Sequence, residues 1–116
     1  MQTHNGSCHC GRVTFTATGD FTKAMECNCS HCARKGFLLS FIPAENFTML
    51  TGEDNLTEYR FNKKHIAHLF CKTCGTQAFG RGTSPDGKET FAVNVRCLPD
   101  VDVSTLIITK VDGKSF

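Results

Sequence analysis

The sequence predicts an all-β fold of short antiparallel sheets with little helix, in a single domain over residues 1–116. Apolar and polar residues alternate in several segments, as they do around Val13, Phe15 and Ala17, which is the pattern of a half-buried strand. No segment keeps the 3.6-residue period of an amphipathic helix. Seven of the eight cysteines occur in local clusters, and a chain of 116 residues is near the size at which a bound metal helps to stabilise a modest core.

The first expected strand covers residues 7–19 and places Val13, Phe15 and Ala17 on one face. A short extended piece and a loop with three cysteines follow over residues 23–32. The next strand is apolar, over residues 37–42, and Pro43 ends it because proline cannot donate to a sheet.

Polar turns divide the middle of the chain into short strands. The turn at residues 51–55 separates strands over 47–50 and 56–61, and the charged turn at 62–64 leads into a strand over 65–70.

The last third of the chain continues in the same way. A strand over 76–80 is followed by a loop over 82–87, where Pro85-Asp86-Gly87 forms the turn. Residues 90–97 alternate well, residues 100–106 suit one helical turn, and a final strand covers 106–111. These segments amount to about eight strands.

The cysteine clusters indicate a soft metal ion. A hydrophobic core gains nothing from grouping small thiols along the chain, whereas neighbouring thiolates can reach one zinc ion at about 2.3 Å each. A Cys-x-x-Cys pair can also be a redox dithiol, but that motif belongs before a helix in a βαβ unit, which this sequence does not predict. The clusters are Cys8-His9-Cys10, Cys27-Asn28-Cys29-Ser30-His31-Cys32 and Cys71-Lys72-Thr73-Cys74.

Spacing permits two ways of sharing these seven ligands between two zinc ions. Either the first and third pairs form a four-sulfur site, which leaves a three-sulfur site at residues 27–32, or Cys29 and Cys32 join the pair at 71–74. Spacing alone does not choose between them.

Charge and hydropathy exclude several classes of protein. The formal charge is +2, and seven thiolates with two zinc ions would bring it near −1, so we expect no nonspecific nucleic-acid binding. No apolar run approaches the ~18 residues of a membrane span. The polar residues 1–6 contain no signal-peptide core, and we therefore expect a cytoplasmic location, where clustered cysteines bind metal more often than they form disulfides.

The order of these motifs resembles the glutathione-dependent formaldehyde-activating family, whose superfamily includes centromere protein V. The resemblance is carried by Cys-His-Cys-Gly at 8–11, Cys-x-Cys-Ser-x-Cys at 27–32 and Phe-Cys-x-x-Cys-Gly at 70–75, with Val-Asn-Val-Arg-Cys-Leu at 93–98 and Asp112-Gly113. It covers nearly the whole chain.

The resemblance implies a β-rich fold with two zinc ions and selects the first sharing scheme. It makes Cys8, Cys10, Cys71 and Cys74 the ligands of a structural zinc, and Cys27, Cys29 and Cys32 the ligands of a second, catalytic zinc. The activity it implies is the condensation of formaldehyde with glutathione to S-(hydroxymethyl)glutathione, the reverse of a carbon–sulfur lyase reaction.

Other residues near the clusters have expected roles. Arg34, Lys35 and Arg96 are candidates to bind the carboxylates of glutathione and to offset the negative charge of a thiolate site. We expect His31 to be an exposed loop residue and Cys97 to be a plain buried cysteine. His65 and His68 would face opposite sides of one strand and not form a pair.

Three functions follow from this sequence. The first is a zinc-dependent carbon–sulfur lyase acting on a glutathione–aldehyde adduct. The second is a non-catalytic, zinc-stabilised binding module of the centromere protein V type. The third is a metal or redox handler, in which the second zinc is labile and its thiols oxidise.

Overall fold

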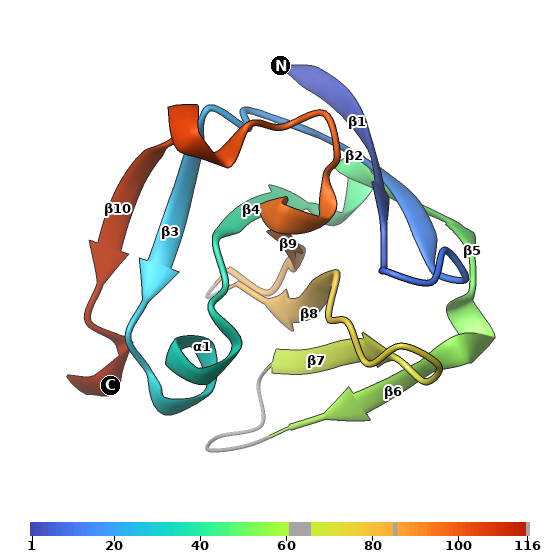
Figure 1. Ribbon diagram of the computed structural model, residues 1–116. Helices are drawn as coiled ribbons and strands as arrows, with labels where there is room; N and C mark the ends of the chain where they lie inside the picture. Colours follow the sequence, from blue (N-terminus) through green and yellow to red (C-terminus); the bar gives the residue numbers. More distant parts are fainter. Residues whose placement is uncertain (61–65, 85, 116) are drawn as a thin grey trace.

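The strands of the protein form two sheets, as seen in the computed structural model, which describes residues 1–60, 66–84 and 86–115 (Figure 1). One sheet has the strand order β1-β2-β5, and the other has the order β10-β3-β4-β9-β8-β7-β6. The strands are Gln2–Ser7 (β1), Thr14–Gly19 (β2), Lys23–Cys27 (β3), Leu39–Pro43 (β4), Phe47–Thr51 (β5), Leu56–Tyr59 (β6), Ile66–Cys71 (β7), Phe79–Thr83 (β8), Glu89–Asn94 (β9) and Ile107–Val111 (β10).

Helical structure among the described residues is limited to short pieces. The α-helix is α1, Ser30–Lys35, and no described helix has the length and apolar character needed to cross a membrane. The 3₁₀ turns are Ala44–Asn46, Glu53–Asn55, Val95–Cys97, Val103–Thr105 and Gly113–Ser115. The β-rich class expected from the alternation is therefore confirmed, with ten strands among the described residues and one helical turn near the expected position 100–106.

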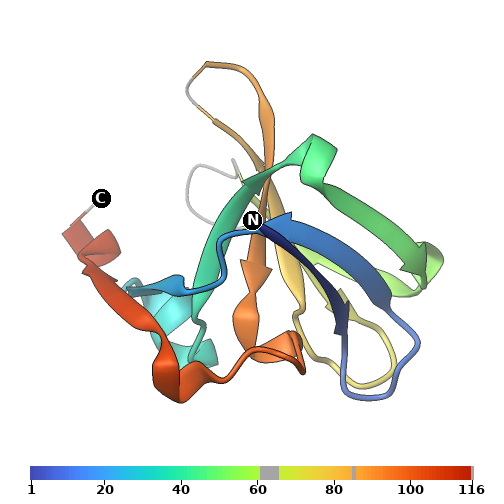
Figure 2. The same ribbon diagram turned by 90° about the horizontal axis from the view of Figure 1, so that it is seen from above.

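Phenylalanine rings join the two sheets. Phe15 of β2 stacks on Phe47 of β5 with ring centroids 5.0 Å apart, and Phe47 stacks on Phe91 of β9 at 4.0 Å. Phe79 of β8 contacts both Phe15 and Phe47. Figure 2 shows the small sheet (blue and green) lying across the larger one. Burial of such rings is the main stabilising term of a core this small.

Several strand predictions need correction. The segment expected as one strand at 7–19 contains the last residue of β1, a turn and then β2, because residues 8–13 form a turn in which Gly11 has a φ of +84°. Strand β1 was not predicted, since its residues are polar and all but Gly6 are at least partly exposed. The strand expected at 90–97 ends at Asn94, and residues 95–97 form a 3₁₀ turn. Strand β8 begins at Phe79 and extends past the expected end at 80, because its pairing with β9 continues to Thr83.

One strand pair also departs from the expected antiparallel pattern. Strand β10 pairs in parallel with β3, with Val111 opposite Cys27. Figure 1 shows these two strands side by side, with α1 below the end of β3. Parallel pairing places the end of β10 and the residues after it next to the end of β3, where the central cysteine cluster begins with Cys27.

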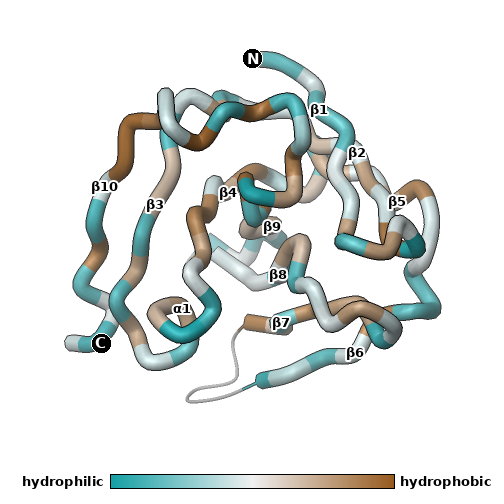
Figure 3. The backbone as a smooth tube through the Cα atoms, viewed as in Figure 1, coloured by the Kyte–Doolittle hydropathy of each residue, from teal (hydrophilic) through white to brown (hydrophobic). Residues whose placement is uncertain are grey.

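Hydrophobic residues occur on both buried and exposed strands. Figure 3 shows hydrophobic residues (brown) along β7, where Ala67 and Leu69 are buried, and at the start of β10, where Ile107 is exposed.

The expected turn at 62–64, together with Phe61, His65 and Pro85, lies outside the described residues.

Candidate metal centres

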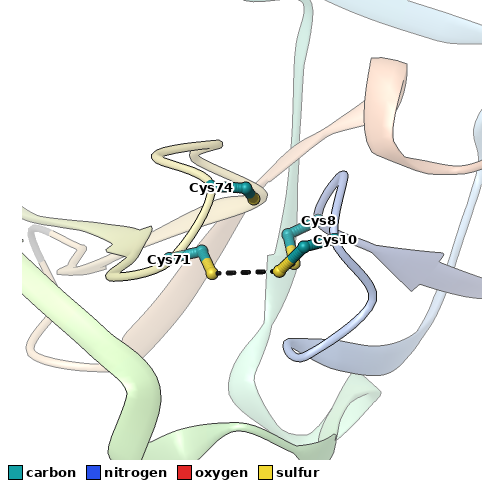
Figure 4. A group of neighbouring side chains, drawn as sticks. All are labelled: Cys8, Cys10, Cys71 and Cys74. Atoms are coloured by element: carbon teal, nitrogen blue, oxygen red, sulfur yellow. Dashed lines mark hydrogen bonds between the residues drawn. The ribbon is translucent and has the colours of Figure 1, made fainter.

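The first cysteine cluster joins two distant parts of the chain. The turn between β1 and β2 supplies Cys8 and Cys10, and the end of β7 with the turn after it supplies Cys71 and Cys74 (Figure 4). The four sulfur atoms all lie within 4.8 Å of one another. We call this group the four-thiol site.

Local backbone geometry aims these sulfurs at a common point. The backbone N–H of Val13 donates to the Cys8 sulfur at 3.4 Å, and the N–H of Thr73 donates to the Cys71 sulfur at 3.4 Å. Gly75 has a φ of +78°, which lets its N–H turn back to the Cys71 carbonyl at 2.9 Å. Such N–H groups stabilise thiolates and orient them as ligands.

The distances fit a tetrahedral zinc ion. Zinc–sulfur bonds of about 2.3 Å place tetrahedral sulfurs about 3.8 Å apart. The Cys10 sulfur lies 3.7 Å from both the Cys8 and the Cys71 sulfur. Hydrogen bonding to the Thr76 side chain lowers the pKa of Cys74 to about 5, and the N–H groups of residues 74 and 73 lower the pKa of Cys71. Burial raises the pKa of Cys8, and a bound cation would favour the ionised form of this thiol.

The second cluster is built by one local turn. Cys27 ends β3, Cys29 caps α1, and Cys32 lies in the helix. The Cys29 sulfur accepts the N–H of Cys32 at 3.3 Å, and the Cys27 sulfur accepts the N–H of Cys29 at 3.5 Å. The three sulfurs again lie within 4.8 Å of one another. We call this group the three-thiol site.

Helix α1 exists because both of its ends are satisfied locally. The Cys29 thiol takes the place of the usual capping hydroxyl, and Gly36 closes the helix in the left-handed region with a φ of +70°. Sequence analysis placed a loop here, because a six-residue helix is too short to show a period.

The three thiols of this turn differ in their tendency to ionise. Burial raises the pKa of Cys29, but the N–H of Cys32 and the neighbouring thiols lower it by more, so the net shift is downward. Burial dominates at Cys32 and raises its pKa strongly. A buried thiol beside one whose pKa is lowered is a donor set that a zinc ion would complete by ionising both.

A cavity of about 480 Å³ opens beside the three-thiol site. This volume falls within the ~300–1,000 Å³ of small-molecule pockets. Cys27 and Cys32 line it, and four charged residues, from β3, from the turn after β9 and from the end of β10, also contribute to the wall. Those charged residues are Glu26, Arg96, Lys110 and Asp112.

The three expected substrate contacts lie in different places. Arg96 lines the cavity, and its Nε donates to the Gly36 carbonyl at 3.2 Å, which fixes the side chain beside α1. Arg34 donates instead to the Ser30 carbonyl at 3.0 Å, and Lys35 lies 5.5 Å from the ring centroid of Phe70. Arg34 and Lys35 are not among the lining residues of this cavity.

Sequence reasoning missed Lys110, Asp112 and Glu26 as cavity residues. Lys110 and Asp112 reach the site only because β10 pairs in parallel with β3. The position of Asp112-Gly113 in the family pattern was a signal that this segment matters, but periodicity carried no information on where it lies.

His31 is not the exposed loop residue that the sequence suggested. It lies in α1, with its ring centroid 4.2 Å from that of His68 and 5.7 Å from that of Tyr59. Burial lowers the pKa of His31, and burial together with the nearby His31 lowers the pKa of His68 to about 4. Two neutral rings can lie in contact in this tilted arrangement, whereas two imidazolium rings would repel each other.

Cys97 is buried, as expected, and lies outside both clusters. Burial raises its pKa to about 11, and its sulfur lies 4.0 Å from the Gln77 carbonyl. A thiol with a raised pKa in this position behaves as a small apolar residue.

Comparison with known proteins gives a family for this arrangement. A family model described as glutathione-dependent formaldehyde-activating enzyme matches residues 3–106. The crystal structure of a Rhodobacter sphaeroides protein is similar, with 30% sequence identity and a TM-score of 0.77, over 90% of this chain and 99% of that one. Because the family model matches most of its residues, the chain belongs to the glutathione-dependent formaldehyde-activating enzyme family.

Proposed function

We propose that this protein is a zinc-dependent carbon–sulfur lyase that joins formaldehyde and glutathione into S-(hydroxymethyl)glutathione, and catalyses the reverse reaction. Family membership supports a formaldehyde-activating or glutathione-related function. The main support for the more specific proposal, a zinc-dependent lyase, is that the three-thiol site borders a charged cavity of about 480 Å³. In this proposal each chain holds two zinc ions, one structural in the four-thiol site and one catalytic in the three-thiol site.

The ligand count supports this division of roles. Four thiolates complete the coordination of a structural zinc, whereas three leave a position for a substrate. A zinc ion bound at the three-thiol site would bind the substrate thiol there and lower its pKa from about 8.5, so that the thiolate predominates at neutral pH.

The cavity walls match the charges of glutathione. Glutathione carries two carboxylates and one ammonium group at neutral pH. Arg96 and Lys110 supply two cations for the carboxylates, and Glu26 and Asp112 supply two anions for the ammonium group. Both cations also offset the negative charge of three thiolates, which would otherwise repel an anionic substrate.

The reaction itself needs little more than proximity. The thiol loses its proton, the sulfur forms a bond to the formaldehyde carbon, and the carbonyl oxygen takes up a proton as the carbon–oxygen π bond breaks. Holding the two reactants together converts a bimolecular step into an effectively unimolecular one. Phe37 and Ala33 provide an apolar part of the wall that excludes water from one side of the cavity.

Exchange NMR tests this function. With ¹³C-labelled formaldehyde and glutathione, the zinc-loaded protein should accelerate exchange between the free aldehyde and the adduct above the spontaneous rate. Cys29→Ser should abolish the acceleration while its circular dichroism spectrum stays native. Cys97→Ser is the matched control, because Cys97 lies outside both clusters. An unchanged exchange rate with wild-type protein would refute the lyase proposal and favour the non-catalytic binding module.

A further inference from the structure

The segment after β10 packs directly against the three-thiol site. A Cβ atom built on Gly113 would clash with the Cys27 sulfur and would lie 3.3 Å from the Cβ of Cys29. The backbone of Gly113 does not adopt the left-handed region, so the position requires glycine for space and not for conformation.

Hydrogen bonds from Asn28 hold this segment in place. The Asn28 side chain donates to the Asp112 carboxylate at 2.9 Å and accepts the backbone N–H of Lys114 at 3.0 Å. The backbone N–H of Asn28 donates to the Val111 carbonyl at 3.1 Å. Since Asn28 stands between Cys27 and Cys29, these three bonds tie the cysteine turn to a segment more than 80 residues later in the sequence.

We propose that Asp112 and Gly113 are positioning residues of the second metal site: they wall off one side of the Cys27 thiol and hold it in the rotamer that completes the three-thiol site. The proposal rests on the proposed function in one respect, which is that this site holds a metal ion.

Physical chemistry explains why a wall is useful here. A cysteine side chain has three staggered rotamers, and only some of them turn the sulfur toward Cys29 and Cys32. Backbone atoms of Gly113 beside the sulfur reduce that freedom before a metal binds, which lowers the entropy cost of binding. The wall also leaves the cavity, lined by Cys27 and Cys32, as the side from which a further ligand can approach.

The glycines in the two turns of the four-thiol site do not pack against its cysteines in this way. Gly11 and Gly75, the glycines of its two turns, have open space where a Cβ would be. Of these three glycines, Gly113 is therefore the one that packs against cysteines, and these belong to the three-thiol site. A substitution at Gly113 should affect the three-thiol site and spare the four-thiol site.

Metal titration of Gly113→Ala tests the proposal. The free Cys27 thiol can rotate away from the added methyl group, so the variant should fold normally, with a native circular dichroism spectrum. That rotation removes a ligand, and binding of the second zinc, measured by competition with a chromophoric chelator, should weaken about 100-fold, at the upper end of the effect of supporting residues. Cobalt(II) titration should show the thiolate-to-cobalt absorption of one site instead of two.

Matched variants separate positioning from general damage. Lys114→Ala, one residue further on, should keep both sites at wild-type affinity. Asp112→Ala should weaken zinc binding at the second site about 10-fold. Asp112→Asn should bind zinc there as wild type does, because the asparagine carbonyl can still accept the Asn28 hydrogen bond.

The outcomes distinguish this proposal from the proposed function. If wild type binds two zinc ions and Gly113→Ala binds both with unchanged affinity, the positioning role is wrong and the lyase proposal stands. If wild type binds only one zinc ion, the proposal of a catalytic zinc is refuted, and the positioning role is refuted with it.

Discussion

The two cysteine sites of this protein differ in how far their cysteines lie apart along the chain. In the four-thiol site Cys10 and Cys71 are 61 residues apart, and two separate turns must meet. In the three-thiol site all three cysteines come from one turn between β3 and α1. A metal in the first site therefore closes a long loop, whereas a metal in the second closes a short one.

Because of this difference, we expect the four-thiol site to contribute mainly to stability and the three-thiol site to be available for chemistry. A ligand set that joins distant segments couples metal binding to folding, because the unfolded chain cannot hold the same ion with all four ligands. A ligand set on one turn contributes little to the global fold. The second site is thus free to keep an open side toward the cavity, and Asp112 and Gly113, tied to Asn28, hold it from a distant part of the chain.

The largest expected effect comes from removing one ligand in each site. Cys71→Ser should lose the four-thiol zinc and several kcal/mol of stability, a large share of the ~5–15 kcal/mol of a typical domain. Thermal unfolding followed by circular dichroism should then show no cooperative transition. Cys29→Ser should keep a transition within a few degrees of wild type. Equal melting temperatures for the two variants would erase the distinction between the sites.

A moderate effect is expected from the cavity cations. Lys110→Met should raise the KM for glutathione about 10-fold and change kcat less, because a charge-assisted hydrogen bond contributes about 1.5 kcal/mol or more. Arg96→Gln should behave in the same way. Arg81→Gln, on the exposed face of β8, is the matched control. Wild-type KM values for both cavity variants would mean that the substrate binds elsewhere.

A further, pH-dependent effect concerns the histidine pair, His31 and His68. His68 lies on β7, three residues before Cys71, and its pKa is lowered to about 4 by burial and by His31. Because the unfolded chain takes up a proton near pH 6.5 and the folded one does not, stability is complete at pH 7 and above and falls as the pH drops from about 6.5 toward 4.

Urea unfolding at several pH values measures this effect. Wild type should lose on the order of 2 kcal/mol from this group between pH 7 and pH 5. His68→Gln, which does not titrate, should show a slope smaller by that amount. Identical slopes for the two proteins would contradict the lowered pKa.

Part of this picture was available from the sequence. Spacing alone grouped the cysteines into local clusters, since neighbouring ligands need only a short turn. The alternation around Phe15 and Phe91 predicted strands that the structure contains. Which distant clusters meet could not be derived from spacing, and the resemblance to the family was needed to pair residues 8 and 10 with 71 and 74.

The remainder depended on contacts that local patterns do not encode. Strand β1 consists of polar residues and one glycine, so it has no apolar face to detect. His31 contacts His68 only because α1 packs near β7. Lys110, Asp112 and Gly113 reach the three-thiol site through parallel pairing of β10 with β3, a relation between segments about 80 residues apart.

Stepwise metal removal tests the division of roles between the two sites. A chelator is titrated into the zinc-loaded protein while released zinc and circular dichroism are recorded together. We expect one zinc ion per chain to leave first with no change in secondary structure, and the second to leave at higher chelator concentration together with unfolding. Loss of both ions in a single step, or unfolding with the first ion, would contradict the separation of a structural site from an open one.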